Sequence, residues 1–273
     1  MSDAALIDND AAGVRRPMLE LRGVGKSFGG LKVIDDLSFK VMQAERVALI
    51  GPNGAGKTSA FNLVSGLYAV DAGSVMLDDA DITRVPSRKR VGYGLARTFQ
   101  NIRLMAQLTV LENVMLGQSA AASSFAGMLQ PVNLLHSNRW REQARAELAA
   151  AGLSQYEKFA GGELPYGIQK RVELVRALLA RPRMLLLDEP AAGLNPTETN
   201  AMRAHLERIA DAGVTLLVVE HDMHFVGALC RRVLVLNFGR LIADCTPREA
   251  QADPRVREAY LGADDDLARQ HAA

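Results

Sequence analysis

The apolar positions in the N-terminal part of the chain follow the short period of β-strands. Between Leu19 and Gly51, the runs LELRGV, LSFKVM and RVALIG are separated by glycine or polar residues, which predicts a series of short strands. The last run is apolar at nearly every position, as in a parallel strand that is buried on both faces. A later run, GSVMLDDADIT, predicts an edge strand that closes a small β region.

Residues 101–182 have the spacing of helices instead. The stretches VLENVML, REQARAELAAAG and QKRVELVRALLARP place apolar residues three or four positions apart. In the third stretch Val172, Val175 and Leu179 share one face, and Pro182 ends the helix. Residues 119–139 follow neither period, and we predict no element for them.

The strand pattern returns after Pro182. MLLLDEP and VTLLVVEH predict buried strands, TETNAMRAHLERIADAG predicts a helix between them, and VLVLNFGRLIADCTP predicts a hairpin that turns near Asn237 and Gly239. This order, with a glycine-rich loop before the first helix, is typical of an α/β nucleotide-binding core. We expect a mostly parallel core sheet, a small antiparallel β subdomain and a helical subdomain inserted at about residues 101–182.

Composition narrows the class of protein. The chain has 273 residues, 48% of them hydrophobic, and a formal net charge of +1. This charge creates no global field that would attract nucleic acid, so we expect no nucleic-acid partner. The two cysteines, Cys230 and Cys245, lack CxxC spacing, which favours reduced thiols in a cytosolic protein.

The ends of the chain predict tails rather than targeting segments. No apolar run approaches the roughly 18 residues of a membrane-spanning helix. The start, MSDAALIDNDAAG, lacks the basic-then-apolar order of a signal peptide. We expect a mobile tail over residues 1–17, one domain over residues 18–262 and a polar tail over residues 263–273, so that contact with a membrane requires other chains.

A glycine-rich loop carries the strongest chemical signal. GPNGAGKT, from Gly51 to Thr58, matches the phosphate-loop pattern GxxxxGK[ST] and lies between an apolar strand and a predicted helix, which argues against a chance glycine turn. Backbone N–H groups would surround phosphate oxygens, Lys57 would reach the β- and γ-phosphates, and the Thr58 hydroxyl would coordinate Mg²⁺. The expected nucleotide-binding residues of the loop are Asn53, Gly54, Ala55, Gly56, Lys57, Thr58 and Ser59.

A pair of carboxylates follows the strand in MLLLDEP. Asp188 and Glu189 lie at the carboxyl end of this strand, the sheet edge where ligands bind in such folds. Alone, the pair would more often be a solvated turn. Together with the phosphate loop, Asp188 is expected to hold Mg²⁺ through water, and Glu189 to orient or deprotonate the attacking water.

At this point the chain resembles the ATP-binding subunits of ABC transporters, P-loop NTPases, over Met18 to Gly262. The motifs that add to the resemblance are SFGG, ARTFQN and VVEHD, each weak alone but present in the family's order. The resemblance implies that Phe28 stacks on adenine, with Val33 also in the nucleotide site. It further implies that Gln100 serves catalysis and Mg²⁺, and that His221 serves catalysis.

The chain is also similar to one subfamily, the Liv-type subunits of branched-chain amino-acid uptake. The matching stretches are SFGGLKVIDDLSF, ARTFQNIRLMAQLTVLENV, LDEPAAGLNPTET, VVEHDMHFV and TPREAQADPRVREAYLG. In AAGLNP, Asn195 stands where many ABC subunits have aspartate. The resemblance implies that Asn195 lies in a loop across a dimer interface, where its amide would hydrogen-bond without adding a charge.

The stretch LPYGIQKR departs from the family signature LSGGQ. Pro165 replaces serine, Tyr166 replaces a glycine and Ile168 replaces glutamine. We expect a working signature, because the N–H groups of Tyr166, Gly167 and Ile168 at a helix start would face the γ-phosphate bound to a second subunit. Pro165, Tyr166 and Gly167 are therefore assigned to the nucleotide site, and the alternative is a plain helix cap.

The resemblance implies an energy-coupling ATPase of an importer, with ATP and Mg²⁺ as its ligands. The implied partners are a second ABC ATPase subunit, identical or paralogous, transmembrane permease subunits that meet the helical subdomain around residues 101–118, and indirectly a periplasmic solute-binding protein. Branched-chain amino acids are the first choice of cargo. Urea, short amides, aromatic acids and other amino acids stay open.

Three other classes of protein fit less well. Soluble ABC proteins of repair or translation usually carry two cassettes or a long coiled-coil insertion, and the sequence has neither. A P-loop kinase or GTPase would leave Gln100, the signature and His221 unexplained. A non-hydrolysing binding module would lack Glu189 or His221, and both are present. The expected location is therefore cytoplasmic, peripheral on the inner face of the plasma membrane.

Overall fold

The N-terminal strands form a small antiparallel sheet. The computed structural model describes residues 16–118 and 138–261, so the predictions for residues 1–15, 119–137 and 262–273 lie outside the described residues. The sheet has the order β2-β1-β4-β5. Its strands are β1 (Pro17–Phe28), β2 (Leu31–Met42), β4 (Ala72–Leu77) and β5 (Ala80–Asp81).

The second sheet forms the core and is mostly parallel, as the apolar runs predict. Its order is β10-β9-β3-β8-β7-β6, and β10 alone among these strands runs antiparallel to its neighbour. The expected hairpin joins β9 to β10 through Phe238 and Gly239, both with positive φ. The strands are β3 (Arg46–Ile50), β6 (Leu95–Arg97), β7 (Met184–Asp188), β8 (Thr215–Val219), β9 (Arg232–Asn237) and β10 (Arg240–Cys245).

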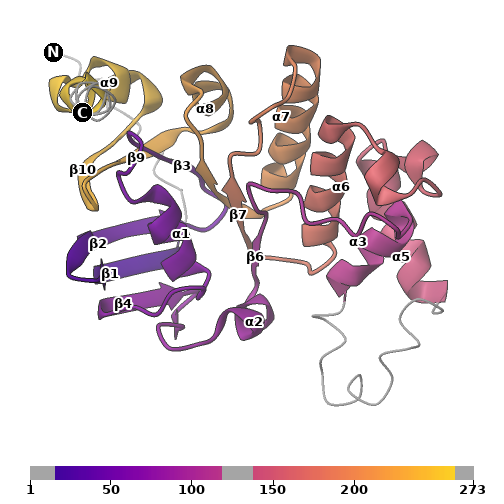
Figure 1. Cartoon of the computed structure of the whole chain (residues 1–273), viewed down its shortest axis with the longest axis horizontal. Coiled ribbons are helices and arrows are strands. Elements are labelled where there is room, and N and C mark those ends of the chain that lie inside the picture. Colours follow the sequence, from indigo (N-terminus) through magenta and orange to yellow (C-terminus); the bar gives the residue numbers. More distant parts are fainter. Residues whose placement is uncertain (1–15, 119–137, 262–273) are drawn as a thin grey trace, which may run out of the picture.

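Alternate residues of the core strands pack into two separate hydrophobic layers. Leu186 and Leu217 face the layer that contains α1 (Lys57–Val64) and the antiparallel sheet. Their neighbours Leu185 and Leu216 face the opposite layer. Figure 1 shows α1 beside the antiparallel sheet, with the helices that cover the other face above the core strands. Those helices are α7 (Pro196–Asp211), α8 (Met223–Leu229) and α9 (Pro247–Ala252).

A helical subdomain with its own core extends from the edge of the sheet at β6, on the right of Figure 1. The predicted face of Val172, Val175 and Leu179 is buried in this core. The helices therefore associate through the stripe that the sequence pattern predicts. Its main helices are α3 (Val110–Met115), α5 (Asn138–Ala150) and α6 (Tyr166–Leu178), with the short 3₁₀ turns η2 (Leu116–Gln118), η4 (Ser154–Tyr156) and η5 (Gly161–Glu163). Helix α2 (Ser87–Arg90) and the turn η1 (Val91–Tyr93) precede β6 and lie outside this subdomain.

Two local predictions differ from the structure, and a third residue, Asn195, has a role within its own chain. Strand β4 pairs with β1 and with β5, so it is an inner strand rather than the expected edge. Pro17, expected in the tail, pairs with Met42 as the first residue of β1. Asn195 caps its own helix α7, because its side-chain oxygen accepts a hydrogen bond from the Glu198 N–H at 3.0 Å and the Glu198 carboxylate accepts one from the Asn195 N–H at 3.0 Å. This reciprocal capping gives the asparagine a role in starting α7, and its position at a dimer interface stays a prediction.

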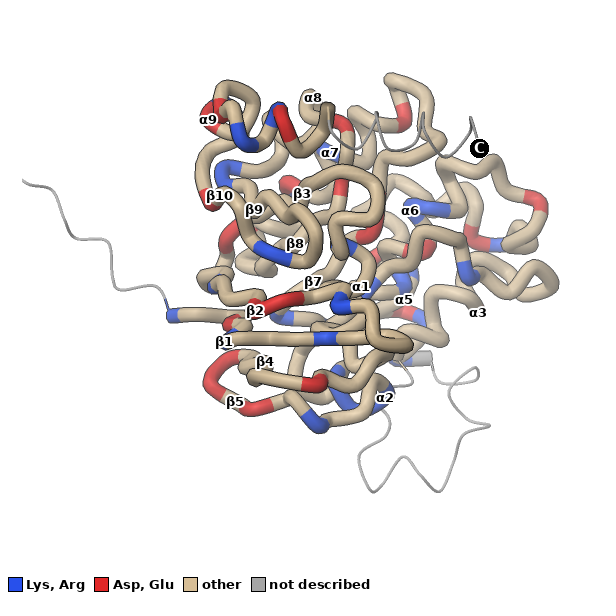
Figure 2. Tube along the Cα trace, turned by 60° about the vertical axis from the view of Figure 1, so that its left-hand side comes forward, with Lys and Arg blue, Asp and Glu red and all other residues tan. Residues whose placement is uncertain are grey.

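Charged residues of both signs are spread over both sheets and the helical subdomain, as Figure 2 shows. Some join neighbouring parts of the core sheet: Arg232 of β9 contacts Glu45, which precedes β3, at 3.0 Å and Asp244 of β10 at 2.6 Å. These contacts, with the hydrogen bond to Asp244 foremost, raise the pKa of Arg232. Within residues 16–118 and 138–261, no helix has the length and apolarity to cross a membrane.

Candidate active site

The phosphate loop joins β3 to α1 and packs closely against residues of β2 and β9. A Cβ at Gly51 would overlap the carbonyl oxygen of Leu236 in β9, and one at Gly56 would lie 2.9 Å from Ile34 in β2. Gly54 has a φ of 78°, and a Cβ there would meet no atom within 4 Å. The glycines therefore serve two needs, close packing beneath the loop and positive φ on its open side.

Lys57 folds back onto the loop that precedes it. Its Nζ donates hydrogen bonds to the carbonyl oxygens of Gly51 and Pro52, at 2.6 and 2.8 Å. Burial lowers the pKa of Lys57, while the nearby Glu189 and Asp188 act in the opposite direction. The ammonium is thus already held over the loop, and a phosphate oxygen that binds it has to compete with two carbonyl groups.

The other predicted residues of the phosphate loop differ in their exposure to solvent. Asn53, Gly54 and Thr58 are exposed, whereas Ala55 is buried and Ser59 is half-buried. The Ala55 N–H donates to the Pro52 carbonyl at 3.2 Å, so this donor is engaged inside the loop. Val33 also lies beneath: its carbonyl oxygen would be 3.1 Å from a Cβ at Gly56. Ala55 and Val33 therefore shape the loop from below in this conformation.

Phe28 forms part of an exposed aromatic pair at the end of β1. Its ring packs edge-on against Tyr68, with centroids 5.1 Å apart, and 41% of the residue is exposed. The Lys26 ammonium lies 5.2 Å from the Phe28 ring centroid. The sequence analysis found Phe28 but missed Tyr68, since a single aromatic residue after a helix gives no signal of its own. An exposed ring of this kind is suited to stacking on a base.

Asp188 is held by a buried arginine that the sequence analysis missed. The Arg97 guanidinium lies 2.8 Å from an Asp188 oxygen, and both side chains are less than 10% exposed. Arg97 also donates to the side-chain oxygens of Asn62 and Ser65, at 2.7 and 2.9 Å. Its position in ARTFQN, three residues before Gln100, was the available signal. This ion pair joins α1, β6 and β7 beside the phosphate loop.

Glu189 is the meeting point of the predicted catalytic side chains. Gln100 Nε2 donates to the Glu189 carboxylate at 2.9 Å, and His221 Nδ1 lies 3.9 Å from the other oxygen of that carboxylate. His221 is also 3.9 Å from a carboxylate oxygen of Glu220, whose pKa is raised by burial. The His221 side chain is 66% exposed. Three residues from separate segments are thus brought together as the sequence predicts.

The residues expected to hold Mg²⁺ offer oxygen donors. Thr58 supplies a hydroxyl group, Asp188 a carboxylate, and Gln100, whose amide nitrogen is bonded to Glu189, an amide oxygen. This donor set suits a hard cation that also takes ligands from phosphate and water. No group of three or more His, Cys, Asp or Glu side chains that could hold a metal ion by themselves occurs among the described residues.

The signature stretch begins helix α6. Pro165 is the N-cap, one position before the helix, and Tyr166 is 46% exposed. The Ile168 N–H donates to the Pro165 carbonyl at 3.0 Å, so the expectation that it faces a phosphate is not met in this conformation. A Cβ at Gly167 would overlap the Glu198 carboxylate of α7, which is a reason for glycine within the same chain. Tyr166 and Gly167 remain as the candidate backbone donors.

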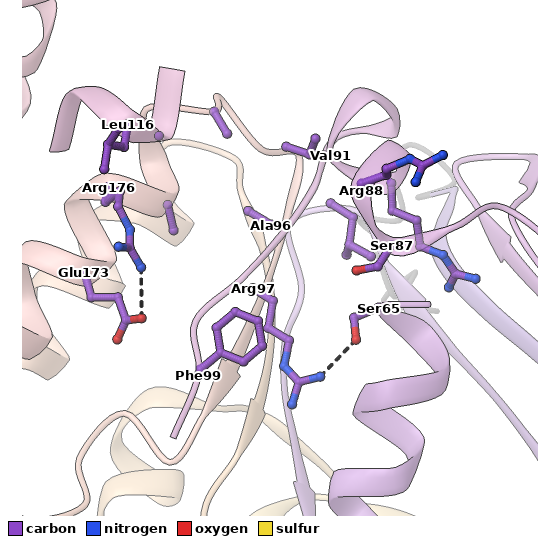
Figure 3. Close-up of a pocket in the computed structure, with 15 residues that line it drawn as sticks. Ser65, Ser87, Arg88, Val91, Ala96, Arg97, Phe99, Leu116, Glu173 and Arg176 are labelled. Atoms are coloured by element: carbon purple, nitrogen blue, oxygen red, sulfur yellow. Dashed lines mark hydrogen bonds and ion pairs between the residues drawn. The ribbon is translucent and has the colours of Figure 1, made fainter. Parts of the chain in front are cut away.

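A groove of about 430 Å³ separates the core from the helical subdomain. In Figure 3, Arg97 and Phe99 lie between the side that carries Ser87 and Arg88 and the side that carries Glu173 and Arg176. Glu173 contacts Arg176 at 3.1 Å, and burial raises the pKa of Glu173. The groove therefore reaches the arginine that holds Asp188.

The C-terminal segment contacts the start of the phosphate loop. Tyr260 is half-buried beside Ile50 and His221. Burial raises the pKa of Tyr260, and a hydrogen bond from the Gly51 backbone opposes this shift. The segment thus touches the first glycine of the loop, a contact that the sequence analysis missed.

Comparisons with known proteins agree with this geometry. A family model described as "ABC transporter" matches residues 34–192, and one described as "Branched-chain amino acid ATP-binding cassette transporter" matches residues 240–266. The chain is 39% identical over 251 residues to BraF of Pseudomonas aeruginosa and 36% identical to LivG of Salmonella typhimurium, both called high-affinity branched-chain amino acid transport ATP-binding proteins. Each match covers 90% of the chain and 98% of the relative.

Solved structures give the same assignment. A nucleotide-free ATP-binding cassette from an ABC transporter matches with a TM-score of 0.81 and 29% identity, covering 89% of this chain and 98% of that one. A cassette in its ADP conformation matches with a TM-score of 0.81 and 31% identity, over 90% and 99% of the two chains. The chain belongs to the ATP-binding cassette family of ABC transporters, whose enzymatic activity is the hydrolysis of ATP.

Proposed function

We propose that this chain is the ATP-hydrolysing subunit of an importer for branched-chain amino acids. The observation that carries the proposal is the convergence of Gln100 and His221 on the Glu189 carboxylate beside a complete phosphate loop. The cargo class is supported by the match of residues 240–266 and by the names of BraF and LivG.

In the proposed reaction, Glu189 accepts a proton from the attacking water. Gln100 orients the carboxylate by donating to one oxygen, and His221 lies near the other, where it holds the water or the γ-phosphate. Lys57 and the loop N–H groups hold the phosphates. Mg²⁺ held by Thr58, Gln100 and Asp188 would neutralise charge on the transferred phosphoryl group.

A second ATPase subunit completes each site in this proposal. Helix α6 begins at Tyr166 with 13 residues, so its N-terminus is a favourable place for a phosphate oxygen. It belongs to the helical subdomain, on the other side of the molecule from α1 in Figure 1. The Tyr166 and Gly167 N–H groups therefore serve the nucleotide on the opposite subunit, as the sequence analysis expects.

The groove of Figure 3 is the proposed contact for the permease subunits. Arg88 and Arg176 line its two sides, so it favours a helix with an acidic or carbonyl-rich end. A permease helix seated there would move the helical subdomain relative to Arg97 and hence to Asp188. A solute-binding protein would act on the permease from the periplasm, and this chain would sit on the cytoplasmic face.

Reconstitution tests the proposal. The chain, assembled with its permease subunits in vesicles and supplied with ATP and the solute-binding protein, should accumulate labelled leucine, isoleucine or valine. Glu189→Gln should abolish uptake while retaining ATP binding, because the base is lost and its shape is kept. Uptake of urea or short amides instead would favour the alternative cargo, and wild-type hydrolysis by Glu189→Gln would contradict the catalytic assignment.

A further inference from the structure

Lys170, one helical turn after Tyr166, is buried against the segment that follows β7. Its residue is 6% exposed, and its Nζ donates to the carbonyl oxygens of Glu189 and Ala192, both at 2.8 Å, with the Pro190 carbonyl at 3.5 Å. An ammonium group is costly to bury, and burial lowers the pKa of Lys170 accordingly. A buried lysine bonded to several carbonyl groups of one short segment constrains the path of that segment.

The backbone that Lys170 contacts has an unusual conformation. Glu189 has a φ of 48°, in the left-handed region that residues other than glycine seldom adopt. Its N–H donates to the Val219 carbonyl at 2.9 Å, and its carbonyl accepts from the Ala192 N–H at 3.2 Å as well as from Lys170. Such strain persists only where neighbours determine the conformation, and these three bonds do so.

A second buried residue holds the same segment from the side of β8. The Glu220 carboxylate accepts a hydrogen bond from the Ala191 N–H at 2.8 Å. Glu220 is 1% exposed, and it precedes His221. Residues 189–192 are therefore tied by side chains to α6 through Lys170 and to the end of β8 through Glu220.

The signature packs onto the same unit. The Lys170 ammonium lies 5.4 Å from the centre of the Tyr166 ring. The ring also lies against Gly193, where a Cβ would be 3.0 Å from one ring carbon. The start of α6, Lys170 and residues 189–193 thus form a continuous contact, so a displacement of the helix start is carried to the Glu189 backbone.

We infer that Lys170 is a positioning residue for hydrolysis, which holds the Glu189 carbonyl and couples the signature helix to the carboxylate of its own chain. The inference rests on the proposed role of Glu189. When the helix start binds nucleotide on a second subunit, Lys170 sets the geometry of Glu189 in its own site. Nucleotide binding at one of the two sites is thereby linked to the geometry of Glu189 in the other site.

Lys170→Met tests the inference, because methionine has a similar length and no hydrogen-bond donor. The variant should lower kcat about tenfold or more with the Kd for ATP changed less than about twofold, since the hydrogen bonds of Lys170 go to the segment after β7 and not to the phosphate loop of its own chain. Lys170→Arg should recover most of the rate, because a guanidinium also donates to carbonyl groups. Lys158→Met, at an exposed position of the helical subdomain, is the matched control and should keep wild-type kcat.

A double-mutant cycle separates positioning from general damage. In the Glu189→Gln background, Lys170→Met should have little further effect on residual single-turnover hydrolysis, because both changes act on one group. Lys170→Met should also still form an ATP-dependent dimer in size-exclusion chromatography. Wild-type kcat in Lys170→Met, additive losses in the double variant, or an Arg variant as impaired as Met would each overturn the inference. Should Lys170→Met fail to fold, Lys170→Arg and Lys170→Gln carry the test, with Arg expected to exceed Gln.

These outcomes remain distinct from failure of the proposed function. If Glu189→Gln hydrolyses ATP normally, the role of Glu189 is wrong and Lys170 has nothing to position. If Glu189→Gln is inactive while Lys170→Met keeps wild-type kcat, the proposed function stands and the role of Lys170 is wrong.

Discussion

His221 is the residue whose share in catalysis is easiest to isolate, because its side chain is exposed and contributes little to packing. His221→Ala should reduce ATP hydrolysis about tenfold or more, while the melting temperature changes little. The expected cause is loss of the group that lies 3.9 Å from the Glu189 carboxylate. Steady-state ATPase assays and thermal melts measure the two effects.

His224→Ala provides the control for His221→Ala. His224 is exposed in the first turn of α8, where its backbone N–H is bonded to the capping Asp222. Removal of its imidazole should leave the rate near that of the wild type. Equal rates of ATP hydrolysis for His221→Ala and His224→Ala would contradict the placement of the active site at His221.

Helix α6 concentrates the departures from the family signature in its first turn. Pro165→Ser should match or exceed the wild-type rate, because serine is a good N-cap and adds a hydroxyl that hydrogen-bonds to a charged oxygen, worth about 1.5–3 kcal/mol. The increase should appear in ATP-dependent dimer formation as well as in turnover. A Pro165→Ser variant with lower activity would mean that proline itself shapes the helix start.

Gly167→Asp tests the same helix start with a change that should lower the activity. It should stop hydrolysis while ATP still binds to the phosphate loop of the same chain, because the signature is proposed to serve the nucleotide of the second subunit. The overlap with Glu198 adds a local cost, so Gly167→Ala combined with Glu198→Ala is the variant that separates crowding within the chain from loss of the phosphate contact. Normal hydrolysis by Gly167→Asp would leave LPYGIQKR as a plain helix cap.

Helix α7 carries a buried histidine that makes stability depend on pH. Burial lowers the pKa of His205 to about 4, from the ordinary value of 6.5 for histidine. The unfolded chain therefore takes up this proton first as the pH falls, and the free energy of unfolding decreases between about pH 6.5 and pH 4. The complete effect is about 3 kcal/mol. Urea melts of His205→Leu should show a weaker loss over this range than those of the wild type, and an identical loss would contradict the assignment.

The elements were largely predictable from the sequence, but some of the contacts between them were not. The apolar runs predict β3, β7 and β8, and the helical stripe of Val172 and Val175 predicts the core of the helical subdomain, because burial imposes period and length. The phosphate loop follows from its motif, and Gln100 and His221 follow as candidates from the family resemblance. Arg97 and Lys170 did not stand out, since a lone basic residue in a helix or strand is usually solvated, and only the folded chain shows their buried acceptors.

At the scale of the whole molecule, the active site is expected to be complete only between two chains. At concentrations well below the Kd of the dimer, the ATPase rate of the isolated chain should rise with about the square of its concentration. It should rise further when permease subunits are added. Measurements over a dilution series, with light scattering to follow the dimer, check this expectation. A rate strictly proportional to concentration, from a stable monomer, would contradict it.

The contact between Tyr260 and Gly51 joins the C-terminal end of the described chain to the first residue of the phosphate loop. Residues 240–266 match a family model of their own, yet this contact ties them to the loop that begins with Gly51. The two regions are therefore expected to covary among relatives rather than to diversify independently. A chimera that exchanges the C-terminal segment from residue 240 onward would need an aromatic residue at position 260 that fits against Gly51. Without such a residue, the start of its phosphate loop would lose this contact.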